Sequence, residues 1–189
     1  MPPVAFIAVA IILGVAVGLA LGGSFQRLGA VSFRRTPLLM LGVVVQVLAG
    51  FVGGGAGLAL VVVSLALLAS FTLANLRLGG MGLAFLGIAM NLAVMAVNGG
   101  MPVRPAAVVA AGLANHEDVA TLDFGTKRHL EQPDDQLMVL ADVLPVPVVR
   151  EVLSFGDLVM SVGVASVLVN LLRPRGRHVA LQPEGGTKV

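Results

Sequence analysis

Long apolar runs without charged residues constrain this chain more than any other feature of its sequence. The first run extends from Val4 to Leu21, and four arginines are the only charged residues between Val4 and Val97. Such runs approach the roughly 20 residues that an α-helix needs to cross the hydrocarbon core of a bilayer. Charged residues make up 12% of the chain, against about a quarter of an ordinary soluble domain. We therefore expect an integral membrane protein.

The spacing of the apolar runs predicts an all-α integral membrane protein with five transmembrane helices. Residues 1–98 form a four-helix region, and the fifth helix covers 157–172. A structured, proline-kinked extracytoplasmic segment over 99–156 connects the fourth and fifth helices, and a basic cytoplasmic tail over 173–189 follows the fifth. The four N-terminal helices are predicted at 4–22, 38–53, 58–76 and 81–98.

The distribution of basic residues predicts the orientation of these helices. With five spans the two termini lie on opposite sides of the membrane, and Lys and Arg concentrate in the cytoplasmic connections. We expect a multi-pass protein with the N-terminus outside, the C-terminus in the cytoplasm, and the acidic segment 99–156 outside. The inner basic residues are then Arg27, Arg34, Arg35, Arg77, Arg173, Arg175, Arg177 and Lys188, and the outer ones are Arg104, Lys127, Arg128 and Arg150.

Small and polar residues recur at helical spacing inside the predicted helices. Gly14, Gly18 and Gly22 lie on one face of the first helix, which lets another helix approach closely, either from the same chain or from a second copy. Gln46 and Asn91 are amides in apolar surroundings, where a lipid-facing position is costly. Each is expected to face the other helices, either in an interhelical hydrogen bond or in contact with a bound cargo.

The segment between the fourth and fifth helices is the least apolar part of the chain. It opens with Asn98-Gly99-Gly100-Met101-Pro102. The alanine-rich stretch 105–114 is too short to span a membrane and is predicted to be a short helix at the membrane interface. The polar stretch 115–135 is predicted to be flexible.

The end of this segment combines a proline kink with a helix-start motif. The apolar residues 136–143 precede Pro145 and Pro147, which prevent a regular helix and favour an extended backbone. Ser154 and Asp157 have the spacing of a capping box, in which each side chain bonds a backbone amide at the start of a helix. The motif therefore has a structural explanation that needs no catalysis.

These landmarks follow one another in a fixed order: Asn98–Val103, His129, Leu140–Pro147 and Val152–Asp157. In this order the chain resembles a bacterial family of small multi-pass membrane proteins classed as a domain of unknown function, number 5317 in the family series. The resemblance extends from the first helix to about Leu172, and it implies the architecture above in a bacterial plasma membrane. Where the family commonly has glycine, this chain has Ala141. The resemblance implies no activity, cofactor or catalytic residue.

Chemistry at a metal or a carboxylate pair is the weaker interpretation. Asp142 and Asp157 could do acid–base work if the proline kink brought them together. The histidine clusters lack the spacing of a His-Glu-x-x-His motif, and the chain contains no cysteine. We therefore predict no metal, no cofactor and no catalytic residue. The clusters are His116 with Glu117 and Asp118, and His129 with Glu131, Asp134 and Asp135.

Two non-enzymatic functions fit the sequence better, and both stay open. The chain either binds or translocates a lipid or small solute at the outer face of the helices, or is a structural or accessory subunit of a membrane complex. Its partners are then membrane lipids, a small-molecule or lipid cargo, or a membrane protein. Nucleic acid is not expected, because no basic face is interleaved with aromatic residues. The candidate contact residues are Gln46, Asn91, Asn98, Gly99, Gly100, Pro102, Asp142, Pro145, Pro147, Ser154, Gly156 and Asp157.

Overall fold

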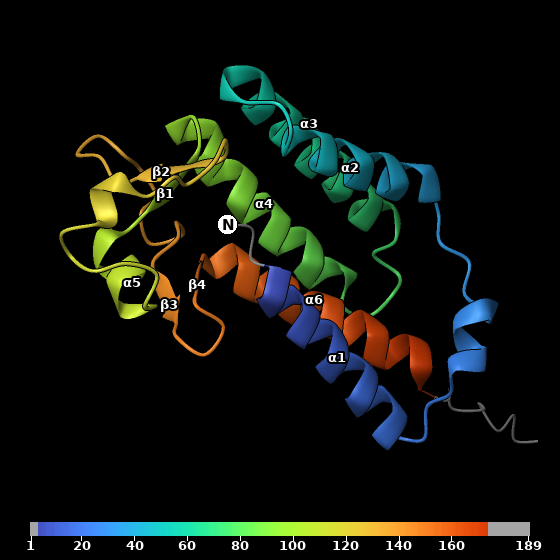
Figure 1. Cartoon of the computed structure of the whole chain (residues 1–189). Helices are drawn as coiled ribbons and strands as arrows, with labels where there is room; N and C mark the ends of the chain where they lie inside the picture. The colour runs from blue at the N-terminus through green and yellow to red at the C-terminus, as the bar shows by residue number, and fades with distance from the viewer. Residues whose placement is uncertain (1–3, 174–189) are drawn as a thin grey trace, which may run out of the picture.

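The computed structural model describes residues 4–173 and is mostly helical (Figure 1). Among these residues α3, α4 and α6 are long and apolar enough to cross a membrane, whereas α1 and α2 are shorter apolar helices. The predicted tail after Arg173 lies outside the described residues. The long helices are α1 (Val4–Ala20), α2 (Thr36–Ala49), α3 (Gly54–Ala74), α4 (Met81–Asn98) and α6 (Phe155–Leu172).

Helix α2 is shorter than the predicted span 38–53. It begins at Thr36 with a proline in its first turn and ends at Ala49, where Gly50 takes the C-cap position. Glycines follow at 53, 54 and 55, and glycine lowers helix stability through its backbone freedom. At 1.5 Å per residue the 14 residues of α2 measure about 21 Å and the 17 residues of α1 about 26 Å, against roughly 30 Å for the hydrocarbon core.

The five long helices lie in a row (Figure 1). Helix α4 packs between α3 and α6, while α2 packs on α3 and α1 packs on α6. At one end of the row the backbone amide of Arg34 donates to Asn75 Oδ1, and Arg27 Nη1 donates to the carbonyl of Leu172. The opposite end holds the α2–α3 turn and the segment that joins α4 to α6. Helices that are consecutive along the chain therefore run in opposite directions.

Glycines set the distance between α4 and α6. A Cβ atom on Gly163 would lie 2.8 Å from the Cα atom of Ala84, and one on Gly87 would meet the backbone of Gly156. The absence of side chains lets the two backbones touch, which is the usual purpose of small residues between membrane helices. This contact fixes where the start of α6 meets the middle of α4.

Helix α1 uses its glycines in the same way against α6. A Cβ atom on Gly14 would lie 2.8 Å from the Cα atom of Ala165, and one on Gly18 would lie 2.8 Å from Leu172 Cδ1. A Cβ atom on Gly22 would meet nothing within 4 Å. The first two glycines of the predicted stripe therefore pack within the chain.

Residues 99–154, called the α4–α6 segment below, form a small unit at the end of the row. The all-α prediction missed its four short strands, and the stretch expected to be flexible, 115–135, contains one of them and a 3₁₀ turn, η2 (Val119–Thr121). Strands of three residues that pair across a long loop leave no periodic pattern in a sequence. Its elements are β1 (Met101–Val103) parallel to β2 (Arg128–Leu130), β3 (Leu144–Val146) antiparallel to β4 (Glu151–Leu153), and the helix α5 (Pro105–Ala110).

Candidate functional site

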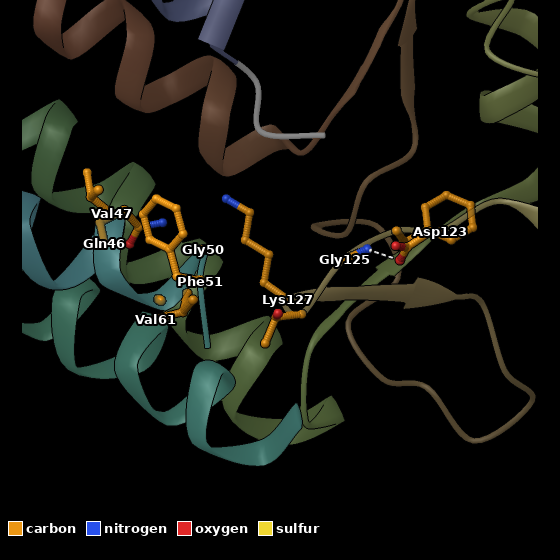
Figure 2. Close-up of a pocket in the computed structure, with 11 residues that line it drawn as sticks. Gln46, Val47, Gly50, Phe51, Val61, Asp123, Gly125 and Lys127 are labelled. Atoms are coloured by element: carbon orange, nitrogen blue, oxygen red, sulfur yellow. Dashed lines mark hydrogen bonds between the residues drawn. The ribbon is translucent and has the colours of Figure 1, made fainter. Parts of the chain in front are cut away.

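A cavity of about 600 Å³ lies where the α4–α6 segment meets the α2–α3 hairpin. Figure 2 shows that α2 and α3 supply one side and the loop 123–127 supplies the other. Its volume is typical of small-molecule sites, and its lining is mostly apolar with a few polar groups. The lining residues are Gln46, Val47, Ala49, Gly50, Phe51, Val61, Asp123, Phe124, Gly125, Thr126 and Lys127.

Backbone contacts hold the loop 123–127 in place on the hairpin. The hydroxyl of Thr126 donates to the carbonyl of Val52 over 3.3 Å. Gly57 makes room for this contact, because a Cβ atom there would overlap the methyl group of Thr126. The amide of Met101 in β1 donates to the carbonyl of Lys127 over 2.8 Å, so that Lys127 is fixed at the start of β2. The local sequence thus sets the position from which the lysine side chain extends.

The side chain of Lys127 extends from the loop 123–127 toward Phe51 in the α2–α3 turn (Figure 2). Within residues 4–173 its amine has neither a hydrogen-bond acceptor nor a carboxylate within salt-bridge distance. Burial lowers the pKa of this amine from its usual value, and the adjacent Arg128 acts in the same direction. The carboxyl group of Asp157 opposes this shift. Lys127 is therefore a half-buried base whose charge is not neutralised by direct contact with this part of the chain.

Gln46 on α2 also lines the cavity and has an acceptor without a donor (Figure 2). Its Oε1 atom is buried and has no hydrogen-bond partner among the described residues. A buried acceptor without a partner costs roughly 1–3 kcal/mol, and most proteins avoid it. A ligand that donates a hydrogen bond removes this cost.

A second pair of charged groups, Arg128 and Asp142, forms an ion pair, although neither oxygen of the buried Asp142 carboxylate has a hydrogen-bond partner among the described residues. Arg128 Nε lies 2.7 Å from Asp142 Oδ2, and the Asp142 side chain is 1% exposed. The backbone of Asp142 bonds Pro102 and Arg104, which places it beside β1. Burial raises the pKa of Asp142 to about 7, against the opposing effect of the Arg128 guanidinium.

Asn91 links α4 to the start of α6 through the capping box. Asn91 Nδ2 donates to Asp157 Oδ1 over 2.8 Å, and the Ser154 hydroxyl donates to Asn91 Oδ1 over 2.8 Å. Ser154 Oγ also accepts from the amide of Asp157, and Asp157 Oδ2 accepts from the amide of Ser154, so that the capping box is complete. Gly156 leaves space for this network, because a Cβ atom there would overlap Asn91 Oδ1.

The Asn98 signature serves to dock the segment. Asn98 Nδ2 donates to the carbonyl of Gln136 over 2.9 Å, and Asn98 Oδ1 accepts from the amide of Gln136 over 2.7 Å. Gly99 and Gly100 follow with φ angles of 64° and 157°, values that favour glycine at this turn. Pro102 is buried in β1.

The remaining candidates lie away from the cavity. Pro145 and Pro147 are both exposed, the first inside β3 and the second at the β3–β4 turn. His129 Nε2 lies 3.1 Å from Asp135 Oδ1, and over residues 4–173 no three His, Asp or Glu side chains gather as a metal site. Asp142 and Asp157 are close enough for their charges to interact, and each is held by partners of its own.

A family model matches residues 30–169, which is more than half of the 189-residue chain. Its description is a family of unknown function, DUF5317. The chain belongs to this family. No curated protein and no solved structure matches the chain.

Of the candidate residues named from the sequence of this DUF5317 member, only Gln46 lines the cavity. From the sequence alone Lys127 is one of the predicted outer basic residues, and no pattern marks Phe51 or Thr126. One signal pointed to the lysine, since Lys127 and Lys188 are the only lysines in the sequence. The cavity itself joins residues about 80 positions apart, such as Gln46 and Lys127, and no local pattern predicts that meeting.

Proposed function

We propose that this protein binds a lipid or a small amphiphilic solute in the cavity between the α2–α3 hairpin and the loop 123–127. The observation that carries the proposal is an apolar cavity of about 600 Å³ bordered by two polar side chains, Lys127 and Gln46, that lack partners in the described part of the chain. An unsatisfied buried acceptor such as Gln46 Oε1 destabilises a fold. A ligand that satisfies both groups gives them a use.

The cavity is expected at the outer surface of the membrane. The five long helices are proposed to cross the bilayer, with α1 and α2 extended by their apolar flanks or by local thinning of the lipid. Arg27, Arg34, Arg35 and Arg77 belong to the end of the row opposite the cavity. The positive-inside rule assigns that end to the cytoplasm. The α4–α6 segment and the cavity are then extracytoplasmic.

Reporter fusions test this orientation. A fusion after Gly54 and one after Lys127 should both report an external location, and one after Gly79 should report the cytoplasm. The reverse pattern, or a fusion after Gly54 that reports the cytoplasm, contradicts the proposed spans of α2 and α3.

Binding is favoured over catalysis by the way the carboxylates are held. Asp157 bonds Asn91 and the capping box, and Asp142 contacts Arg128, so that each carries a structural duty. Binding is favoured over passage through the protein because the helices pack in a row, each mainly against its neighbours. A ligand site at one end of such a row needs no enclosed path.

Native mass spectrometry of the protein, extracted gently from its own membrane, tests the proposal. The wild-type protein should carry one retained small molecule per chain. Val47→Trp should lose it, because the indole ring fills the cavity from α2. Val44→Trp is the matched control, since Val44 lies on the same helix, is similarly exposed and does not line the cavity.

Two outcomes would count against the proposal. Protein that arrives bare in all three forms, or a retained molecule that Val47→Trp does not displace, removes the cavity as the site. A protein partner that copurifies with every form in place of a small molecule favours an accessory subunit of a membrane complex.

A further inference from the structure

We infer that the ligand is an anionic amphiphile, whose phosphate or carboxylate group pairs with Lys127 and whose apolar chain leaves the cavity along α2 into the lipid. The inference rests on the proposed function and specifies the chemistry of the ligand at the same cavity.

The charge of Lys127 is available to a ligand, and the other charges around it are already engaged. The nearest basic side chain, Arg128, contacts the Asp142 carboxylate at 2.7 Å and donates to the carbonyl of Val152. Asp157 accepts from Asn91. Lys127 alone extends into the cavity without a partner of its own within residues 4–173. A charge-assisted hydrogen bond from this amine to an anionic oxygen is among the stronger contacts a protein makes.

Gln46 narrows the chemistry of the headgroup further. Its Oε1 atom lacks a donor, so that the headgroup should carry a hydroxyl group or a protonated acid oxygen beside its anionic oxygen. A phosphate monoester in its singly protonated form carries both. A carboxylate carries only the anionic oxygens and leaves Gln46 Oε1 without a donor. Lys127 can pair with either a phosphate or a carboxylate, whereas the side-chain amide of Gln46 favours the phosphate.

Asp123 is the one carboxylate in the lining and must be compatible with an anion. Its Oδ1 atom accepts from the amide of Gly125 over 2.8 Å, and Figure 2 shows the carboxylate turned toward that amide on the far side of the loop from Gln46. Asp123 is also exposed, so that water screens its charge. The anion should therefore lie on the Gln46 side of the cavity.

The apolar wall gives the direction of the chain. Val47 is 56% exposed and Phe51 is 83% exposed, and both line the cavity. In the proposed membrane orientation these side chains meet lipid near the outer surface. A ligand whose headgroup lies in the cavity can then place its hydrocarbon chain along Phe51 and the exposed face of α2.

Four probes of the same chain length test the inference on purified protein in neutral detergent. They are hexadecyl phosphate, hexadecanoate, hexadecanol and hexadecyltrimethylammonium, and inorganic phosphate serves as a competitor. We expect hexadecyl phosphate to bind most tightly, hexadecanoate next, and the neutral and cationic probes at least tenfold more weakly than the phosphate, about 1.4 kcal/mol per factor of ten. Inorganic phosphate at millimolar concentration should not displace hexadecyl phosphate if the apolar chain contributes to binding.

Three variants assign the effect to the amine. Lys127→Met should lower the affinity for both anionic probes by roughly tenfold and leave hexadecanol unchanged. Lys127→Arg keeps the charge and should restore much of the affinity. Arg104→Met is the control for general electrostatics, because it removes a positive charge from the same segment at an exposed salt bridge outside the cavity.

The possible outcomes distinguish a failure of the anionic headgroup from a failure of the cavity as the binding site. If hexadecanol binds as tightly as the anions, and Val47→Trp abolishes its binding, the anionic headgroup is refuted and the cavity stands as the site. If Lys127→Met and Arg104→Met weaken the anions equally, the effect belongs to net charge and the inference fails. If no probe binds, or binding is unaffected by Val47→Trp, the proposed function fails with it. Displacement by inorganic phosphate identifies free phosphate, and not a lipid headgroup, as the ligand.

Discussion

The contact between α4 and α6 and the cavity at Lys127 treat buried polar side chains in opposite ways. At the helix contact, Asn91, Ser154 and Asp157 bond one another and the backbone. In the cavity, the amine of Lys127 and Gln46 Oε1 both lack hydrogen bonds to the described chain. The first arrangement is closed by close-packed helices, while the second opens beside an exposed apolar helix face.

Whether a polar side chain has its hydrogen bonds complete distinguishes a structural residue from a candidate ligand contact better than its residue type does. All of these side chains are polar residues in apolar surroundings, and any of them could be read as a ligand contact from sequence. A polar group whose bonds are complete has no capacity left for a ligand, whereas an incomplete one has a cost that a ligand can remove. The comparison therefore predicts that changes at the helix contact reduce stability, and that changes in the cavity reduce binding.

The largest effect is expected from Gly163→Leu at the helix contact. A Cβ atom at Gly163 meets the backbone of Ala84, which cannot move without separating α4 from α6. We expect a loss of about 4 kcal/mol or more, seen as aggregation on size-exclusion chromatography or a strongly lowered Tm. Gly82→Leu on α4 is the control, because the nearest atom to its Cβ position is 3.9 Å away. If both variants lowered the Tm equally, the close packing of α4 against α6 at Gly163 would not be what stabilises the fold.

The next effect is expected from Asn91→Ala. The change leaves Asp157 Oδ1 without the Asn91 donor and the Ser154 hydroxyl without its acceptor, in a site that the helices exclude from water. A loss of about 1–3 kcal/mol follows from such unsatisfied groups. Asn170→Ala provides the control on α6, since Asn170 is exposed and, among residues 4–173, its side chain bonds only the carbonyl of Ser166 on its own helix. Thermal unfolding of both variants in one detergent measures the difference.

Features that depend on neighbouring residues could be predicted from the sequence. The capping box of Ser154 and Asp157 is confirmed, because it involves residues within one turn of the same helix. The apolar runs locate the five long helices, with ends shifted by several residues where glycines stop or start them. Gly14 and Gly18 of the predicted stripe on α1 do face another helix, and they pack within the chain.

Features that depend on contacts between residues far apart in the sequence could not be predicted. Strand β1 pairs with β2 across 24 intervening residues, Thr126 reaches Val52, and three-residue strands have no visible period. These contacts create the cavity and give Lys127 its position. The sequence therefore ranked Asn91 and Asp142 as candidates and passed over the lysine, because the missing bonds of a residue are visible only once its neighbours are known.

Asp142 lies between the two regions and gives a pH test of the comparison. Its pKa is raised by burial from 3.8 to about 7, so that the folded state holds this proton more tightly than the unfolded state does. Stability from this group is therefore highest at low pH and should decrease as the pH rises from about 4 to about 7. Burial sets most of this value, and among the described residues the charges of Arg128, Asp157 and Lys127 modify it.

The measurement is the Tm of wild type and Asp142→Asn across that range of pH. The wild-type value should fall relative to that of the variant and then run parallel to it above about pH 7. If the wild-type Tm rose relative to that of the variant as the pH increased, the attraction of Arg128 would outweigh the effect of burial, and Asp142 would be charged across this range. Asp142 would then be as well satisfied by its partner as the polar groups at the α4–α6 contact.

The smallest change in stability, and the most informative, is expected from Lys127→Met. A half-buried amine without a partner adds no bond to the fold, so that the variant in detergent without ligand should be as stable as wild type or more stable at neutral pH. Because the pKa of Lys127 is lowered by burial, the folded state releases this proton before the unfolded state does. Wild-type stability should then increase as the pH rises through the lowered pKa toward 10.5, and the gap between the two proteins should close. A clear loss of stability in Lys127→Met at neutral pH would show that the amine serves the fold, and the cavity would then differ from the α4–α6 contact only in its openness.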